Sequence, residues 1–179
     1  MKRLWKQCML TLFVLFTLVG CSNEEGMNWL FFSQIPSEAE ADVAAIVNEV
    51  NTSDSADALT IQLISPAYER LINEIASHHG DILFIDESML YPAVLDPEGL
   101  VPLDEIAGEE FATLPSDYKA VHPDTGEEHV YVLPIENDSR LLSELGIETT
   151  NKLLALIPIY SDYSKQSLEV LKKLAEKQK

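Results

Sequence analysis

The chain has 179 residues, of which 46% are hydrophobic, and its 30 acidic and 12 basic side chains give a formal net charge of −18 at pH 7. This length and hydrophobic content are sufficient for one domain with its own core. The charge argues against nucleic acid as a partner, because phosphates would be repelled, and its simplest interpretation is a solvated acidic surface.

Residues 1–20 have the pattern of a targeting segment. Three basic side chains precede an apolar run at residues 8–19, which is too short for a comfortable bilayer span. Residues 18–21 then read Leu-Val-Gly-Cys, which resembles the lipobox of bacterial lipoproteins. The resemblance implies cleavage before Cys21, diacylglycerol on its sulfur, and a lipid anchor on the extracytoplasmic face of the cell membrane. The alternative is an ordinary secretory signal peptide or an uncleaved anchor, with Cys21 as a plain thiol.

The chain contains two cysteines, Cys8 and Cys21. Cleavage would remove Cys8, and lipid would occupy Cys21, so the mature chain of 179 − 20 = 159 residues would have no free thiol. A disulfide, a cysteine nucleophile and a thiolate metal site are then excluded. Cleavage also removes three positive charges and no acid, which changes the formal charge from −18 to −21.

After the signal, residues 21–27 are expected to form a lipidated tether and residues 28–179 a single α/β domain. Residues 28–33 predict a first strand from their apolar cluster. Ser37 and Glu40 have the spacing of a capping box, with the serine at the N-cap of a helix. That helix is expected to bury one apolar face, formed by Val43, Ile46, Val47 and Val50.

Residues 59–88 predict strand, helix and strand joined by short turns. Ser65 is expected to cap the helix, with Pro66 in its first position, where a missing N–H costs nothing. Gly80 is expected to stop the helix with a positive φ. The next strand, residues 82–85, is apolar throughout, as strands covered on both faces are. The helix face is formed by Tyr68, Leu71, Ile72 and Ile75.

The rest of the chain predicts shorter elements. Residues 89–94 are expected to form a short helix, and residues 118–122 and 129–133 a hairpin around Pro-Asp-Thr-Gly-Glu. A short helix stopped by Gly146, a strand at residues 153–159 and a final helix capped by Asp162 or Ser164 complete the chain. The alternation predicts an α/β fold: a three-layer-like β-α-β-α-β sheet with helices on its faces, plus the hairpin.

Two segments carry a further resemblance. Residues 99–104 read Gly-Leu-Val-Pro-Leu-Asp, and residues 130–134 read Val-Tyr-Val-Leu-Pro. With the lipobox and the strand ending in Asp86, they resemble the N-terminal lobe of extracellular solute-binding lipoproteins of ABC importers, of the sugar-binding type. Members of that family hold their ligand between two lobes of a periplasmic-binding-protein fold. Only 45 residues follow Pro134, which leaves no room for a second lobe, so an accessory, sensor or adaptor lipoprotein is the alternative.

A binding site is expected where the parallel strands end. Ligands of open α/β sheets bind beyond the carboxyl ends of the strands, and polar side chains follow two of these ends. The helix expected after Pro66 would point its N-terminus toward the same place. The expected ligand rim comprises Ser65, Asp86, Glu87, Ser88 and, as a ring that could stack on a sugar, Tyr131.

No catalytic motif of the serine-hydrolase, P-loop, zincin or dinucleotide-binding kind occurs, so no enzyme activity and no cofactor are expected. A metal site would need three or four converging ligands, and only His122 and His129, on the two sides of the hairpin turn, could face each other. The expected partners are the membrane, through Cys21, and either a small solute or a membrane protein.

Overall fold

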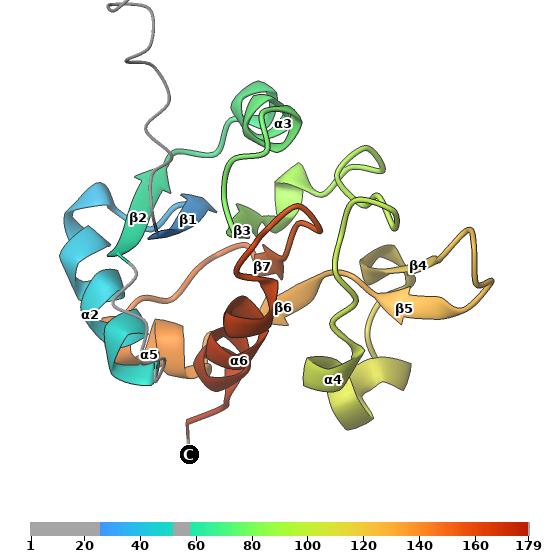
Figure 1. Ribbon diagram of the computed structural model, residues 1–179. Helices are drawn as coiled ribbons and strands as arrows, with labels where there is room; N and C mark the ends of the chain where they lie inside the picture. The colour runs from blue at the N-terminus through green and yellow to red at the C-terminus, as the bar shows by residue number, and fades with distance from the viewer. Residues whose placement is uncertain (1–25, 52–57, 179) are drawn as a thin grey trace, which may run out of the picture.

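The computed structural model describes residues 26–51 and 58–178, so the predicted signal peptide, Cys21 and residues 22–25 of the tether lie outside the described residues. Within these ranges the chain forms a five-stranded sheet in the order β2-β1-β3-β7-β6 and a separate two-stranded sheet, β4-β5 (Figure 1). Helices lie against the larger sheet, which confirms the predicted α/β class.

Three parallel strands form one half of the large sheet: β1 (Gly26–Phe32), β2 (Ala58–Ile64) and β3 (Ile82–Asp86). The two strands predicted around the central helix, β2 and β3, are not neighbours, because β1 lies between them and pairs with both. The sequence of β1 explains this position. Its side chains from Trp29 to Phe32 are all buried, which requires apolar partners on both sides and both faces.

β1 begins two residues earlier than predicted, at Gly26. Gly26 has a φ of 140°, and a side chain there would place its Cβ 2.1 Å from the backbone oxygen of Ala58. Only glycine allows this approach of the first two strands. Met27 follows as a buried residue, and its sulfur accepts a hydrogen bond from the indole nitrogen of Trp29 at 3.4 Å. The strand therefore reaches the core at its second residue, Met27.

The other half of the sheet is antiparallel. β7 (Leu153–Leu156) pairs with β3, and β6 (Leu133–Ile135) pairs with β7. β7 ends three residues before the predicted end of the last strand, at residue 159. Because β7 is antiparallel to β3, its first residue lies opposite Asp86, at the end of the sheet where the parallel strands finish.

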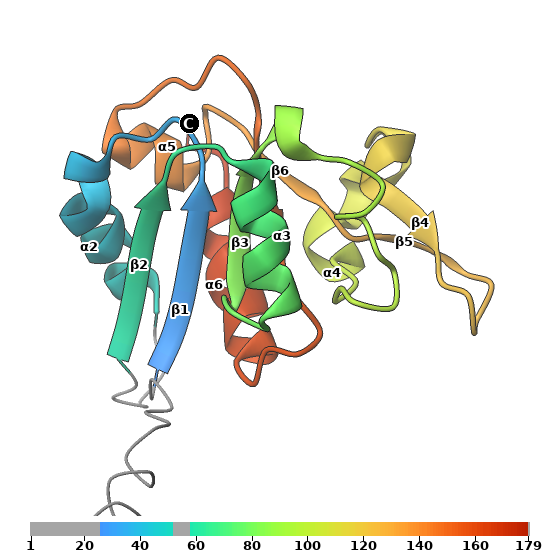
Figure 2. The same cartoon turned by 90° about the horizontal axis from the view of Figure 1, so that it is seen from above.

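Helices cover both faces of this sheet. Figure 2 shows α3 (Tyr68–Ala76) on one face and α2 (Glu40–Val50), α5 (Arg140–Leu145) and α6 (Ser164–Ala175) on the other. The side chains of β1 divide between the two cores, as strand alternation requires: Trp29 and Phe31 pack toward α2 and α6, and Leu30 and Phe32 toward α3. The predicted faces of α2 and α3 are confirmed.

Three predicted N-caps are wrong. Ser37 lies in a 3₁₀ turn (Ser37–Ala39), and α2 begins after it at Glu40 without a side-chain cap. Ser65 and Pro66 precede α3, which begins at Tyr68 after an extended residue, Ala67. The residue before a proline is biased away from helical backbone, and here the extended stretch carries the chain from β2 to the face of the sheet. α6 is preceded by Tyr163 and has no side-chain cap.

The N-cap of α5 was not predicted, and the end of α3 was predicted at the wrong residue. Ser139 caps α5 by accepting a hydrogen bond from the Leu142 N–H at 3.3 Å, and Gly146 ends that helix with a φ of 64°, as predicted. α3 ends before Gly80: His78 takes the left-handed backbone with a φ of 57°. The His79 N–H then bonds the Glu74 carbonyl at 2.9 Å, which forms a Schellman motif. Gly80 has the predicted positive φ, 88°, but it lies after the end of the helix and is buried beside β3.

The predicted helix at residues 89–94 is wrong. A 3₁₀ turn (Glu87–Met89) follows β3, and only turns come after it, because Pro92 disfavours helical backbone at Tyr91.

Farther along the chain, a short helix α4 (Asp104–Ala107) precedes the predicted hairpin of β4 (Lys119–Val121) and β5 (Glu128–Val130). Two 3₁₀ turns, Gly108–Ala112 and Ser116–Tyr118, lie between α4 and β4. The second hairpin strand is shorter than predicted, because the chain leaves it after Val130 and joins the main sheet as β6.

Leu71 gives a test of the packing of α3. Its side chain is fully buried, so Leu71→Ala should leave a cavity and lower the free energy of unfolding by about 2–5 kcal/mol. Urea denaturation would measure the loss. Arg70→Ala, which removes only an exposed ion pair with Glu74, should cost under about 0.5 kcal/mol. Equal losses for the two variants would contradict the assigned core.

Candidate functional site

The carboxyl ends of β1, β2 and β3 lie at one end of the sheet, together with the start of β7 (Figure 2). The side chains that follow or precede these strand ends form a polar surface, which we call the rim. Two predicted site residues, Asp86 and Ser88, lie at its centre, while Ser65 lies beyond β1 at the exposed end of β2. The rim comprises Ser33, Gln34, Ser65, Asp86, Glu87, Ser88, Asn151 and Lys152.

Asp86 is 4% exposed, and its carboxylate accepts hydrogen bonds from three parts of the rim. Ser88, in the turn that follows, donates from its backbone N–H at 3.0 Å and from its hydroxyl at 2.6 Å. Asn151 donates from before β7 at 3.0 and 3.2 Å to the two oxygens, and Gln34 from after β1 at 3.4 Å. The carboxylate therefore joins the ends of β1, β3 and β7.

These hydrogen bonds determine the protonation state of Asp86. Burial alone would raise the pKa of the carboxyl, but the donors from Ser88, Asn151 and Gln34 favour the ionised form and hold the pKa below its ordinary value. Asp86 is therefore an anion whose charge is satisfied inside the protein.

The carboxylate of Glu87 also has a hydrogen-bond donor within the protein. Its carboxylate accepts a hydrogen bond at 2.6 Å from the hydroxyl of Tyr118, which is 2% exposed. Burial and this carboxylate raise the pKa of Tyr118 well above its ordinary value, so the phenol stays protonated and keeps donating. Lys152 extends the rim toward β6, where it lies 3.6 Å from Glu136.

Tyr131 does not lie at the rim. It is fully buried in the core cluster on the α3 side of the sheet, and its hydroxyl has no hydrogen-bond partner among the described residues. Burial and the nearby charge of Asp104 raise the pKa of its phenol. Its ring is therefore a core element, and the predicted role in stacking on a ligand has no exposed surface to support it.

Gln34, Asn151 and Lys152 are rim residues that the sequence did not reveal. Gln34 follows a predicted strand, so its position was available as a signal. Asn151 and Lys152 precede a strand, and they reach the rim only because β7 runs antiparallel to β3. The direction of a short apolar strand cannot be obtained from its own sequence.

The rim encloses little space. A hollow of about 10 Å³ lies between Ser33, Gln34, Asp86, Asn151 and Lys152, with Thr149 and Leu153 beside it. This is room for about one water molecule and too little for a sugar ring. The rim is therefore a polar surface with its own hydrogen bonds made, not a preformed pocket for a small solute.

The histidines do not form the metal site considered from the sequence. The hairpin register places Ala120 opposite His129, and His129 bonds to Asp104, while the His122 ring accepts the Asp124 N–H at 3.3 Å. In residues 26–51 and 58–178 no three histidine, cysteine, aspartate or glutamate side chains are grouped closely enough to hold a metal ion.

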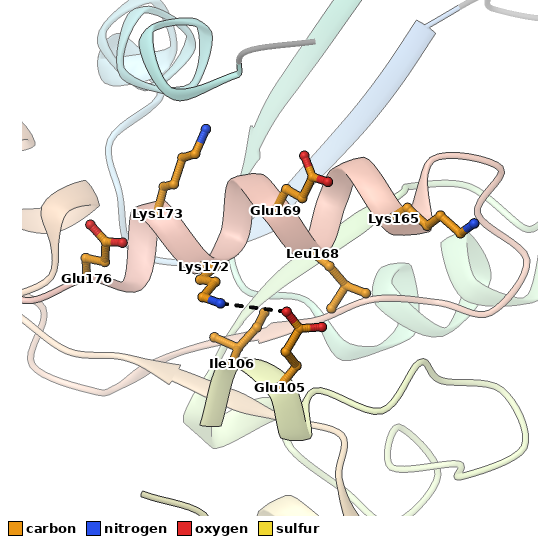
Figure 3. A pocket seen from close by; sticks show the side chains of 8 residues that line it. All are labelled: Glu105, Ile106, Lys165, Leu168, Glu169, Lys172, Lys173 and Glu176. Carbon is orange, nitrogen blue, oxygen red and sulfur yellow. Dashed lines mark ion pairs between the residues drawn. The ribbon is translucent and has the colours of Figure 1, made fainter. Parts of the chain in front are cut away.

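A larger hollow, of about 530 Å³, lies between α4 and α6 (Figure 3). Its apolar residues are Ile106 and Leu168, and Lys172 spans it to Glu105 at 3.7 Å. The remaining lining residues are Lys165, Glu169, Lys173 and Glu176. Three lysines and three glutamates balance in charge, and none of the residues predicted for a site lies there.

Among the helices that the structure describes, none has the length and hydrophobicity of a membrane span.

The Asp86 network predicts a pH-dependent stability. A carboxyl whose folded pKa is depressed stabilises the fold above its unfolded pKa of about 3.9 and loses that contribution as the pH falls through the folded pKa. Asp86→Asn should therefore cost about 1–3 kcal/mol at neutral pH, and the difference from wild type should shrink below about pH 4. Urea denaturation at a series of pH values measures both.

Ser88→Ala is the matched variant, because it removes one donor and leaves the carboxylate in place. It should cost less than Asp86→Asn at neutral pH. A wild-type-to-Asn difference that stays constant from neutral pH to pH 3 would show that Asp86 is not ionised by this network.

With this geometry established, comparison with known proteins shows a similar protein. The chain is 26% identical over 163 residues to the Bacillus subtilis (strain 168) protein named "Putative lipoprotein YteS", and the match covers 91% of this chain and 90% of that protein. No protein-family model matches the chain, and no solved structure matches it. The chain is thus similar, along nearly its whole length, to a protein that is named as a lipoprotein.

Proposed function

We propose that this protein is a lipoprotein anchored through Cys21 to the extracytoplasmic face of the cell membrane, and that its domain is a binding module without catalytic activity. The lipobox at residues 18–21 supports the anchor, and so does the name of the similar Bacillus subtilis protein. The absence of a catalytic motif from the sequence supports the second part of the proposal.

The state of the rim indicates what kind of ligand the module would bind. Its buried acid, Asp86, has its donors supplied by the protein, and the hollow beside it holds about one water molecule. A small solute gains affinity mainly by being enclosed, and this surface encloses nothing of that size. We therefore favour a protein partner that covers the rim, with Ser65 and Lys152 as its exposed contacts. The role would be that of an accessory, sensor or adaptor lipoprotein.

Sugar-type solute binding in ABC import is the second candidate. It is supported by the resemblance of residues 99–104 and 130–134 to solute-binding lipoproteins, and by the position of the rim beyond the carboxyl ends of parallel strands. In this case a second chain would have to supply the surface that encloses the solute.

The anchor is tested at Cys21. Protein isolated from membranes should begin at this cysteine and carry the added mass of a diacylglycerol, and Cys21→Ala should release the chain from the membrane fraction or leave it uncleaved. Intact-mass measurement and fractionation give the result. A wild-type chain without lipid mass would refute the anchor.

The two binding roles are separated by two measurements. A photo-crosslinking residue at Lys152 in the rim should capture a partner from native membranes, whereas the same group at Asp124, in the exposed hairpin turn, should not. Equal capture from the two positions would remove the rim from the proposal.

The solute role predicts instead a thermal shift with a sugar or oligosaccharide. Ligand at 100 times its Kd would raise the free energy of unfolding by about 2.7 kcal/mol. A panel of sugars that produces no shift would eliminate sugar-type binding by this chain alone.

A further inference from the structure

The place where β1 begins determines which end of the domain lies near the membrane, provided that Cys21 carries lipid as proposed. Five peptide steps separate Cys21 from Gly26, so this connection spans at most about 18 Å. β1 then runs for seven residues, about 23 Å, toward the rim. The end of the sheet where β1 begins, which we call the tether-side edge, is therefore held close to the bilayer, and the rim lies at the opposite end (Figure 2).

The tether-side edge is formed by segments that are distant in the sequence. Besides the start of β1 it contains the turn after α3 and the loop between β7 and α6 (Figure 2). Asp81 joins them: its carboxylate accepts the Asn28 N–H at 2.7 Å and the Ser161 hydroxyl at 2.6 Å. Tyr160 adds a hydrogen bond from its hydroxyl to the His79 carbonyl at 2.8 Å. The loop after β7 is thus fixed next to the point where the tether enters.

This loop presents an apolar side chain to solvent. Ile159 is 59% exposed, although its backbone N–H is bonded to the Gly99 carbonyl at 2.9 Å. Tyr160 follows it, half-buried, with its ring stacked on His78 at 4.6 Å between centroids. A single exposed apolar residue is ordinary on a protein surface, so exposure alone indicates nothing. The significance of Ile159 comes from its position at the end of the domain that the tether holds near lipid.

The chemistry of this edge suits the headgroup region of a bilayer. An aliphatic side chain gains free energy by leaving water there, and a tyrosine places its ring in the apolar part and its polar tip in the wet part. Lys165, exposed at the start of α6, adds a cation directly after this loop. We infer that Ile159 and Tyr160 contact the headgroup region of the bilayer that holds the anchor, so that the rim is presented away from the membrane.

Charge limits the strength of this contact. After signal cleavage the mature chain would have a formal charge of −21. Anionic lipids would therefore repel the domain, and the contact depends on the tether, which keeps the edge at a high local concentration near the surface. Neutral lipid should allow the contact, and added anionic lipid should weaken it.

Fluorescence quenching tests the orientation. After signal cleavage and acylation of Cys21 the chain has no other thiol, so a fluorophore can be attached at Ile159→Cys or, as the rim control, at Ser65→Cys. The natively lipidated protein is placed in phosphatidylcholine vesicles that contain lipids with a nitroxide on the headgroup. The fluorophore at position 159 should lose about half of its intensity or more, and the one at position 65 should be unchanged, because the quencher acts only near the surface.

A second variant excludes insertion driven by the fluorophore itself. A fluorophore at Asp162→Cys, three residues farther along the same loop, should be quenched in the otherwise natural chain and should lose that quenching when Ile159→Asp is added. Equal quenching at positions 159 and 65, or no effect of Ile159→Asp, would overturn the orientation while leaving the lipid anchor intact. A chain whose intact mass shows no lipid would overturn the anchor and the orientation together.

Discussion

The burial of β1 on every side is the constraint on which the architecture depends. Its side chains from Trp29 to Phe32 alternate between two cores, and its backbone pairs in parallel with β2 on one side and β3 on the other. A strand in this position needs helices on both faces of the sheet, and α3 supplies one cover while α2, α5 and α6 supply the other. Phe31 stacks on Phe84 of β3 at 4.1 Å, so neighbouring strands are joined by rings as well as by their backbones.

The rim follows from this arrangement, because strands of fixed direction bring their polar ends together. Asp86 then acts as a structural acid: its negative charge is stabilised by donors from the segment after β1, from the segment before β7 and from its own turn, which holds the three chain segments together. A group bound in this way is poorly suited to capture a new ligand, since any ligand would have to replace donors already at hydrogen-bond distance. The surrounding exposed side chains are the part of the rim that remains accessible.

The sequence predicted the parts of this fold that depend on local periodicity. The apolar faces of α2 and α3, the stop at Gly146 and the hairpin before β6 all follow from residues close in the chain. The insertion of β1 between β2 and β3 and the antiparallel course of β7 depend on long-range packing, which no local pattern encodes. The predicted N-cap at Ser65 is wrong for the same reason. After β2 the chain must first pass from the end of the sheet to one of its faces, so α3 begins only at Tyr68. At the rim, the positions of Asp86 and Ser88 could be predicted because they end and follow a recognisable strand. The position of Asn151 could not, because it depends on the order and direction of the strands in the sheet.

Gly26 has a mechanical consequence if the anchor is at Cys21. The tether would enter the sheet at the start of β1, where a Cβ on Gly26 would lie 2.1 Å from the backbone oxygen of Ala58. A pull from the membrane would then load β1 along its own axis. The pairings from Gly26 to Phe32 with β2, and from Trp29 to Phe32 with β3, would have to slide together and could not open one at a time. Because many hydrogen bonds would share this load, the lipid would be attached to a strand that both of its neighbours hold against the pull.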